Sequence, residues 1–256
     1  MLAVERQSRI TEALRTSRTL STEDLANELG VSLETIRRDF VVLEKRGTLS
    51  RVHGGATITL GHAGEEATFV ERAGSATEAK TRIGRAAAGF LQPGQTVIID
   101  IGTTAVSVAR AIPRTFSGTV ATCSLLVAAE LAEHPGVDVL VCGGKLRPGD
   151  LALSNATALT FFSGLHADIA FLGSGGVDAD AGLTDFYLDE VSVRQAMVRN
   201  SARAYALADS SKFGRVARFT VAGFDELAGV ITEAEPSPQL RDAITGSGGE
   251  VVLSKR

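Results

Sequence analysis

The feature that most constrains the fold is an alternation of short apolar runs with longer amphipathic segments between residues 96 and 253. The apolar runs are rich in β-branched residues and are bounded by Gly, Ser, Thr or Asp, a pattern typical of buried strands. Apolar strands that alternate with helices predict an α/β domain whose mostly parallel sheet is covered on both faces. The expected strands are Thr96–Asp100, Thr119–Thr122, Val137–Cys142, Asp168–Leu172, Tyr205–Ala208, Gly229–Thr232 and Glu250–Leu253.

The segments between the expected strands carry helix signals. A helix from about Thr77 to Phe90 ends before Pro93-Gly94. Gly102-Thr103-Thr104 opens a second helix, and Ser124 is placed to cap a third that runs to about Glu133. A further helix is expected near Asp189–Ala202.

The first sixty residues have a different pattern, in which three short helices precede a hairpin. Apolar residues recur at helical spacing near Val4–Thr16, in a segment that follows Ser21 and stops at Gly30, and in a third segment that follows Ser32. The short turn that contains Gly30 has the length that a helix-turn-helix requires. The inner faces are expected to hold Ile10, Ala13, Leu14, Leu25, Ala26, Leu29, Ile36, Phe40 and Leu43.

The outward face of the third segment carries the candidate DNA contacts. At about 100° per residue, Arg38 lies nearly opposite the inward-facing Ile36. Hydroxyl and guanidinium groups therefore gather near a capped N-terminus, as on helices that read the major groove. The candidates are Ser32, Thr35, Arg37, Arg38 and Lys45. The alternative is an ordinary helical cap with exposed arginines, because Glu34 and Asp39 reduce its positive charge.

A hairpin is predicted directly after the third helix. The segment from Thr48 to Ile58 contains Gly54-Gly55, which predicts a tight turn between two strands. A two-stranded wing behind a recognition helix would bring Arg51 and His53 to backbone phosphate or to the minor groove. An ordinary hairpin with an exposed Arg and His is the alternative.

The charge of the chain restricts how it can bind nucleic acid. The formal net charge is −4, although residues 1–60 hold nine Lys and Arg against eight Asp and Glu. Nucleic-acid binders usually present a basic surface, so contacts with DNA must come from local placement of charge. We therefore expect affinity to depend on a homo-oligomer, a dimer or a tetramer.

Other sequence features exclude several classes of protein. No apolar run approaches the roughly 18 residues of a membrane span, and the N-terminus has no signal-peptide core. Cys123 and Cys142 lie in or beside apolar runs without metal-site spacing, so they are expected to be buried thiols. The chain is predicted to be cytoplasmic, with no membrane partner, metal or cofactor. Residues 61–76 are predicted to link a DNA-binding domain (1–60) to a sensing and oligomerisation domain (77–256).

Small and polar side chains gather where the expected strands end. In open α/β sheets the ligand lies beyond the carboxyl ends of the strands. A Gly-Thr-Thr helix N-terminus suits a phosphate, and carboxylates beside it can accept hydrogen bonds from sugar hydroxyls. Each residue taken alone can equally be an ordinary turn or cap. Together they predict a phosphorylated-sugar site formed by Asp100, Gly102, Thr103, Thr104, Thr122, Ser124, Gly143, Gly144, Lys145, Asp178 and Lys212.

Two segments make the N-terminal pattern specific. Thr35-Ile36-Arg37-Arg38-Asp39 and Arg51-Val52-His53-Gly54-Gly55-Ala56 resemble the signature of the DeoR (deoxyribose-repressor) family of bacterial transcriptional regulators. The resemblance implies a winged helix-turn-helix in which Thr35, Arg37 and Arg38 read double-stranded operator DNA. It also implies that Arg51 and His53 steady the wing.

The second half resembles the sensor domain of the same family. The segments that carry this resemblance are Asp100-x-Gly102-Thr103-Thr104, Gly143-Gly144-x-x-Arg147, Asp168 through Gly176-Val177-Asp178, Gly182-Leu183-Thr184 and Asp209-Ser210-Ser211-Lys212-Phe213-Gly214. The resemblance implies a fold similar to ribose-5-phosphate isomerase and, as effector, a phosphorylated intermediate of carbohydrate metabolism. The sequence departs from the family pattern at Ile101, Cys123 and Ser154-Asn155, which bears on the identity of the sugar rather than on its class.

Three functions remain open at this point. The first is a repressor of carbohydrate catabolism genes that a sugar phosphate releases from its operator. The second is an activator or dual regulator with the same two domains. The third is a sugar-phosphate enzyme, for which Glu190 would be the general base. The glycine-rich lysine segment that accompanies the catalytic glutamate of the isomerases is not visible here. For a regulator, we expect the sensor domains to form the oligomer. We expect the effector to change the spacing between the paired DNA-binding domains or, alternatively, to order the linker.

Overall fold

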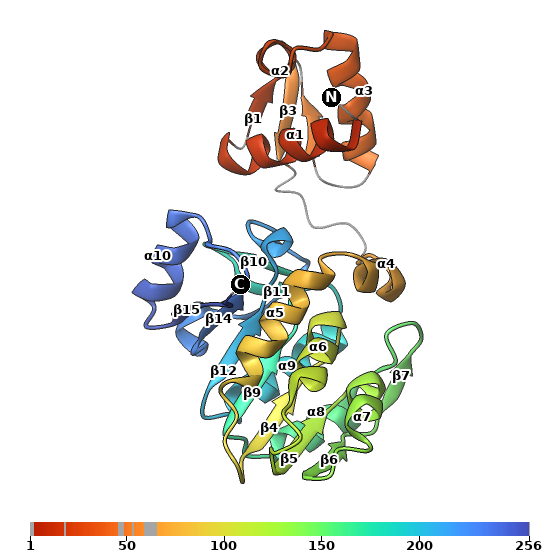
Figure 1. Ribbon diagram of the computed structural model, residues 1–256, viewed down its shortest axis with the longest axis vertical. Coiled ribbons are helices and arrows are strands. Elements are labelled where there is room, and N and C mark those ends of the chain that lie inside the picture. The colour runs from red at the N-terminus through yellow and green to blue at the C-terminus, as the bar shows by residue number, and fades with distance from the viewer. Residues whose placement is uncertain (1–2, 18, 46–48, 53, 59–65, 256) are drawn as a thin grey trace. The chain divides into compact units, whose positions relative to one another are not determined.

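The computed structural model describes residues 3–17, 19–45, 49–52, 54–58 and 66–255. The chain divides into two compact units, Met1–Gly64 and Glu65–Arg256, each with its own core (Figure 1). Within the described residues, no helix is both long and apolar enough to cross a membrane.

Three helices form the first unit where the apolar spacing predicts them: α1 (Ala3–Ser17), α2 (Thr22–Leu29) and α3 (Leu33–Lys45). The hydroxyl oxygen of Ser21 accepts backbone N–H bonds from Glu23 and Asp24, which starts α2. Gly30 ends the same helix at a φ of 64°, a left-handed conformation that favours glycine.

The core of the first unit confirms the predicted inner faces. Ala13 is only half-buried, but the other predicted positions are all buried. Replacing any one of the large members by Ala is expected to destabilise such a core by about 2–5 kcal/mol. The core residues are Ile10, Leu14, Leu25, Ala26, Leu29, Ile36, Phe40, Leu43, Leu49 and Ala56.

The predicted hairpin is present and gains a third strand that was not predicted. Strands β2 (Leu49–Val52) and β3 (Gly55–Ile58) pair antiparallel, and β1 (Thr19–Ser21) pairs with the other edge of β3. Gly54 has a φ of 82° and precedes β3, whereas Gly55 is already its first residue, so the predicted Gly-Gly turn is wrong by one residue. A Cβ at Gly55 would lie 2.1 Å from the carbonyl oxygen of Leu20, so the pairing of β1 with β3 needs glycine there.

A seven-stranded parallel sheet forms the centre of the second unit and confirms the predicted α/β class. Its strand order is β15-β14-β12-β9-β4-β5-β6. The bounds are β4 (Thr96–Ile99), β5 (Gly118–Thr122), β6 (Val137–Val141), β9 (Ile169–Leu172), β12 (Ala204–Leu207), β14 (Gly229–Thr232) and β15 (Glu250–Leu253).

Helices cover both faces of this sheet, as Figure 1 shows. Val97 and Ile99 of β4 point to the face covered by α5 (Thr77–Ala88), α6 (Thr103–Ala111) and α7 (Leu125–Leu131). Ile98 points to the opposite face, which packs against α8 (Ala156–Ser163), α9 (Leu188–Arg199) and α10 (Pro238–Gly246). Burial on both faces explains why the strands are apolar at consecutive positions.

Short strands and turns that were not predicted complete the second unit. A small antiparallel sheet contains β10 (Gly176–Asp178), β11 (Gly182–Asp185) and β13 (Phe219–Ala222), and a hairpin pairs β7 (Lys145–Arg147) with β8 (Ala152–Ser154). Two 3-10 turns are η1 (Ser210–Lys212) and η2 (Phe224–Glu226). Cys123 and Cys142 are free and buried, as predicted.

The described part of the predicted linker belongs to the second unit. Residues 66–76 contain a helix, α4 (Phe69–Gly74), which Thr68 and Glu71 start as a capping box. Arg72 of this helix is ion-paired with Glu66 and with Asp150, so the segment is attached to the second unit and the prediction of a linker is corrected there.

Candidate functional site

Helix α3 exposes the two arginines that the sequence analysis placed on its outer face. The side chains of Arg37 and Arg38 are 66% and 80% exposed. Their partner is Glu34 on the same helix, at 3.9 Å from Arg37 Nη1 and 3.6 Å from Arg38 Nε. Exposed pairs of this length contribute little to stability, so both guanidinium groups are available to a ligand.

The N-terminus of α3 presents hydroxyl groups beside these arginines. Ser32 Oγ accepts the backbone N–H of Thr35 at 3.2 Å and lies 2.9 Å from Thr35 Oγ1. Ser32 is exposed and Thr35 is half-buried. The cap therefore fixes the first turn of the helix while it leaves hydroxyl groups at the surface, as base readout at a helix N-terminus requires.

Asp39 does not reduce the positive charge of this face, contrary to the sequence interpretation. Its side chain is buried, where it is ion-paired with Arg6 and accepts a 2.9 Å hydrogen bond from Gln7 Nε2. The acidic residue of α3 that remains beside Arg37 and Arg38 is Glu34.

The wing is tied to the recognition helix through Arg51. Arg51 donates to Glu44 from both its backbone N–H, at 3.0 Å, and its Nε, at 2.6 Å. These bonds lower the pKa of the Glu44 carboxyl, because they favour its charged form. A surface groove of about 560 Å³ runs between the wing and α3, and its lining includes Arg37, Arg38 and Arg51. His53 and the side chain of Lys45 lie outside the described residues.

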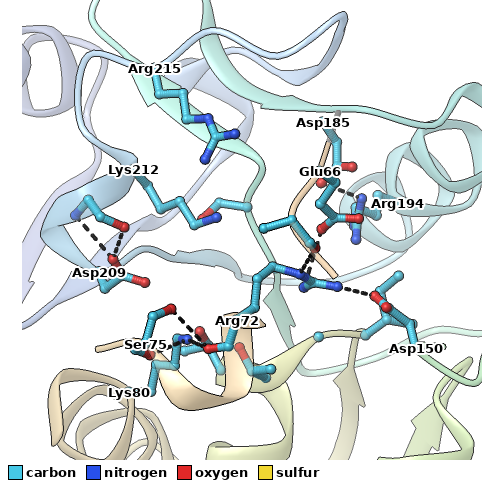
Figure 2. Close-up of a pocket in the computed structure, with 18 residues that line it drawn as sticks. Glu66, Arg72, Ser75, Lys80, Asp150, Asp185, Arg194, Asp209, Lys212 and Arg215 are labelled. Carbon is cyan, nitrogen blue, oxygen red and sulfur yellow. Dashed lines mark hydrogen bonds and ion pairs between the residues drawn. The ribbon is translucent and has the colours of Figure 1, made fainter. Parts of the chain in front are cut away.

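The second unit contains a cavity of about 140 Å³ beyond the carboxyl ends of β4, β9 and β12, three neighbouring strands of the sheet. Figure 2 shows that charged side chains from several loops and helices point into it. Its lining residues are Glu66, Ala67, Arg72, Ser75, Lys80, Ile101, Gly102, Thr103, Thr104, Asp150, Gly173, Ser174, Asp185, Arg194, Asp209, Ser211, Lys212 and Arg215.

Two cations at this cavity have neither an ion-pair nor a hydrogen-bond partner among the described residues. Lys212 follows β12 on η1, and burial, with Arg215 as a second cause, lowers the pKa of its ammonium group to about 8. The guanidinium of Arg215 lies 5.1 Å from the centre of the Phe186 ring, and burial lowers its pKa as well. Both groups are desolvated, and the carboxylates near them oppose the lowering of their pKa only in part, so an anion in the cavity would be attracted to them.

The N-terminus of α6 opens on the same cavity. Gly102 precedes the helix at a φ of 101°, and no side chain caps it. The free N–H groups of this first turn and the helix dipole favour an anion. Thr103 and Thr104 are half-buried, and their hydroxyl groups add further hydrogen-bonding capacity.

Asp100 lies beneath the cavity rather than in its lining. Its carboxylate accepts the backbone N–H of Gly173 at 2.9 Å and is ion-paired with Arg194. Arg194 also pairs with Asp185, 2.8 Å from Nη1 to Oδ2, and both residues line the cavity. The role of Asp100 in this geometry is to hold Arg194 at the base of the site.

The structure brings Gly102, Thr103, Thr104 and Lys212 together in the cavity lining, but it does not bring the remaining predicted residues there. Thr122 Oγ1 accepts the N–H of Ser124, whose hydroxyl in turn caps α7. Asp178 Oδ1 accepts two backbone N–H bonds in the turn between β10 and β11. Gly143 and Gly144 have positive φ in the turn before β7, on which Lys145 is exposed.

The sequence analysis missed several residues that line the cavity, most of them from elements or loops that were not predicted and one, Arg194, from the predicted helix α9. They include Glu66, Arg72, Asp150, Asp185, Arg194 and Arg215. Arg215 had a usable signal, since it follows Lys212 by three residues in the same glycine-containing loop. In the described residues, no group of His, Cys, Asp and Glu is arranged to hold a metal ion.

Comparison with known proteins gives matches over nearly the whole chain. Residues 6–60 match the family model of the DeoR-like helix-turn-helix domain, and residues 75–234 match that of the DeoR C-terminal sensor domain. A solved structure of ribose 5-phosphate isomerase A from Methanocaldococcus jannaschii shares 15% identity, with a TM-score of 0.40 over 54% of this chain and 55% of that chain.

Two curated relatives span the full length of both domains. The HTH-type transcriptional regulator GlpR of Haloferax volcanii is 37% identical over 254 residues, 98% of each chain. The glycerol-3-phosphate regulon repressor of Escherichia coli is 32% identical over 245 residues, 96% of each chain. With both domains matched in order, this chain belongs to the DeoR family of transcriptional regulators.

Proposed function

We propose that this chain represses carbohydrate catabolism genes and that a phosphorylated sugar modulates its affinity for operator DNA. The observation that carries the effector half of the proposal is the pair of cations Lys212 and Arg215, which have no ion-pair or hydrogen-bond partner among the described residues, in a cavity that also contains the N-terminus of α6. A phosphate group would satisfy all three at once, and the carboxylates opposite can accept hydrogen bonds from hydroxyl groups.

The DNA-binding half rests on α3 and the wing. Thr35, Arg37 and Arg38 are proposed to contact base edges, with Ser32 and Lys45 beside them, because the described arginines are exposed and tied only to Glu34. Arg51 and His53 are proposed to contact phosphates. Relatives named as repressors, among them the glycerol-3-phosphate regulon repressor and GlcR of Bacillus subtilis, support repression over activation.

The enzyme alternative receives no support from Glu190. Burial raises the pKa of this carboxyl to about 7, a value that suits a general base. However, Glu190 is not in the cavity lining, and Arg147 Nε lies 2.6 Å from Oε1. A carboxylate engaged in this way has no access to a sugar in the cavity, so we propose binding without turnover.

The proposal is tested by binding isotherms of the full chain with duplexes from its own promoter region. Wild type is measured alone and with glycerol 3-phosphate, ribose 5-phosphate, fructose 6-phosphate and inorganic phosphate, and thermal shifts show which of these anions bind. We expect at least one sugar phosphate to change operator affinity by about fivefold or more. Arg38→Ala should cost about 1–3 kcal/mol of operator binding, while Arg110→Ala, which removes another exposed arginine, in the second unit, serves as control. An operator affinity that no phosphorylated sugar changes contradicts the sensing half, and full binding by Arg38→Ala contradicts the DNA-reading half.

A further inference from the structure

Arg72 of α4 holds together three parts of the second unit. Its Nε donates to the carbonyl oxygen of Ala67 at 2.9 Å, its Nη1 lies 3.2 Å from Glu66 Oε1, and its Nη2 is ion-paired with Asp150. Asp150 follows β7, so one guanidinium group ties the start of this unit to the β7–β8 hairpin. Figure 2 shows Arg72 in the middle of these partners, at the edge of the cavity.

The same guanidinium lies next to the N-terminus of α6. A Cβ built at Gly102 would be 3.7 Å from Arg72 Nη1. The partial positive charge of a helix N-terminus and a guanidinium repel each other unless an anion lies between them. A phosphate at this N-terminus would therefore be within reach of Arg72, which can bind it with two parallel N–H bonds.

Glu66 depends on Arg72 more than on any other group. Its side chain is 11% exposed, and its other cation, Arg147 Nη1, is farther away at 3.5 Å from Oε2. Burial raises the pKa of the Glu66 carboxyl, and the charge of Arg72 is the main effect that opposes this. Loss of one cation from a buried pair leaves a charge that is costly to keep buried. Glu66 would then leave its position.

We infer that Arg72 contacts the effector and exchanges Glu66 for the anion, so that occupancy of the cavity releases the segment 66–68 from the second unit. This inference rests on the proposed function, since it needs an anion at the α6 N-terminus. The released segment leads, through residues 59–65 of the sequence, into the DNA-binding unit. The released segment is joined to the DNA-binding unit by the continuous backbone, so the exchange would link effector binding to DNA binding.

Hydrogen exchange of the full wild-type chain tests the exchange directly. Spectra are recorded with inorganic phosphate and with sodium chloride at matched ionic strength. We expect phosphate to speed amide exchange in peptides that cover residues 66–74 and to slow it in peptides that cover the start of α6. If thermal shifts show phosphate binding while exchange over 66–74 stays unchanged or slows, the inference is wrong and the proposed function stands.

The variant Glu66→Gln tests the consequence for regulation. Glutamine keeps the shape but removes the charge that ties Glu66 to Arg72, so the variant without effector should resemble wild type with effector. We expect the variant to bind the tested sugar phosphates at least as tightly as wild type does. We also expect these sugar phosphates to change its operator affinity by no more than about twofold. Glu130→Gln, which breaks a surface pair with Arg110, is the matched control.

The outcomes separate the inference from the proposal beneath it. A Glu66→Gln chain that binds sugar phosphate and keeps the full wild-type change in operator affinity overturns the inference alone. If wild type shows no thermal shift with any anion of the panel, the proposed function fails and the inference fails with it. Should Glu66→Gln not fold, the hydrogen-exchange experiment on wild type decides.

Discussion

Lys212 and Arg215 show what a single residue's environment adds to its sequence context. Lys212 was predicted because it follows a strand end, a position that the sheet topology assigns to ligands. Arg215 was overlooked, although its spacing from Lys212 in the same loop was a usable signal. Its contact with the ring of Phe186, which follows the unpredicted strand β11, became visible only in the tertiary structure.

The lowered pKa of Lys212 makes effector binding sensitive to pH. Only the protonated ammonium attracts a phosphate, so this contribution is present below about 8 and is lost as the pH rises through that value. The second pKa of a phosphate ester is about 6, so the charge of the effector stays constant over the same interval. Titration calorimetry from pH 7 to 9.5 should show affinity falling by up to about tenfold per pH unit above the pKa.

Two substitutions isolate the lysine in this pH dependence. Lys212→Arg keeps its charge throughout this range, so its affinity for the sugar phosphate should remain nearly constant. Lys145→Arg changes an exposed lysine of β7 that does not line the cavity and should retain the wild-type profile. An unchanged fall in Lys212→Arg would assign the pH dependence to another group.

Asp39 illustrates a limit of reading one helix at a time. Its place on the outer flank of the apolar stripe was read as exposure, but Arg6 and Gln7 of α1 cover it. Burial of a carboxylate needs such partners, and these come from a part of the chain more than thirty residues away. The helical period fixes the direction of a side chain but not what packs over it.

At the level of elements, hydropathy rather than strand length decided which ones the sequence predicted. The seven strands of the central sheet were placed to within a residue or two, because they stand out as mostly apolar runs between helical segments. Strands β1, β7, β8, β10, β11 and β13 have only three or four residues each and were missed. Except for β13, each of these strands holds only one or two apolar residues, so it does not stand out as an apolar run. The missed strands hold or flank Arg147, Asp185 and Asp150.

The pairing of β1 with β3 leaves no room for a side chain at Gly55. Alanine there would place its Cβ 2.1 Å from the Leu20 carbonyl oxygen, so β1 and β3 must separate. We expect Gly55→Ala to destabilise the first unit by about 1–3 kcal/mol and to weaken operator binding. Fluorescence anisotropy with operator DNA and a thermal shift with sugar phosphate measure the two units separately.

The effector response of Gly55→Ala should stay at the wild-type value, because the second unit has its own core. Gly246→Ala is the control, since a Cβ there meets no atom within 4 Å. If Gly55→Ala binds the operator as tightly as Gly246→Ala, the third strand is not needed for the DNA-binding form of the wing.

For the whole molecule, charge argues that one DNA-binding unit is not enough. Residues 1–60 carry a net charge of only +1 within a chain of −4. A single recognition helix then gains little from the phosphate backbone, which supplies most non-specific affinity. We propose that two or more copies, joined through their second units, provide the missing affinity by binding paired half-sites.

Paired readers make operator spacing a strict requirement. Inserting about five base pairs between the half-sites rotates one of them by half a helical turn relative to the other. Inserting about ten base pairs returns both half-sites to the same face of the DNA helix. We expect the first insertion to reduce affinity to that of a lone half-site and the second to recover part of the loss. Sedimentation of the full chain at the concentrations used should show a dimer or a larger species. Equal affinity for both insertions would mean that each unit binds DNA independently, and the operator affinity would then have to come from α3 and the wing of one chain.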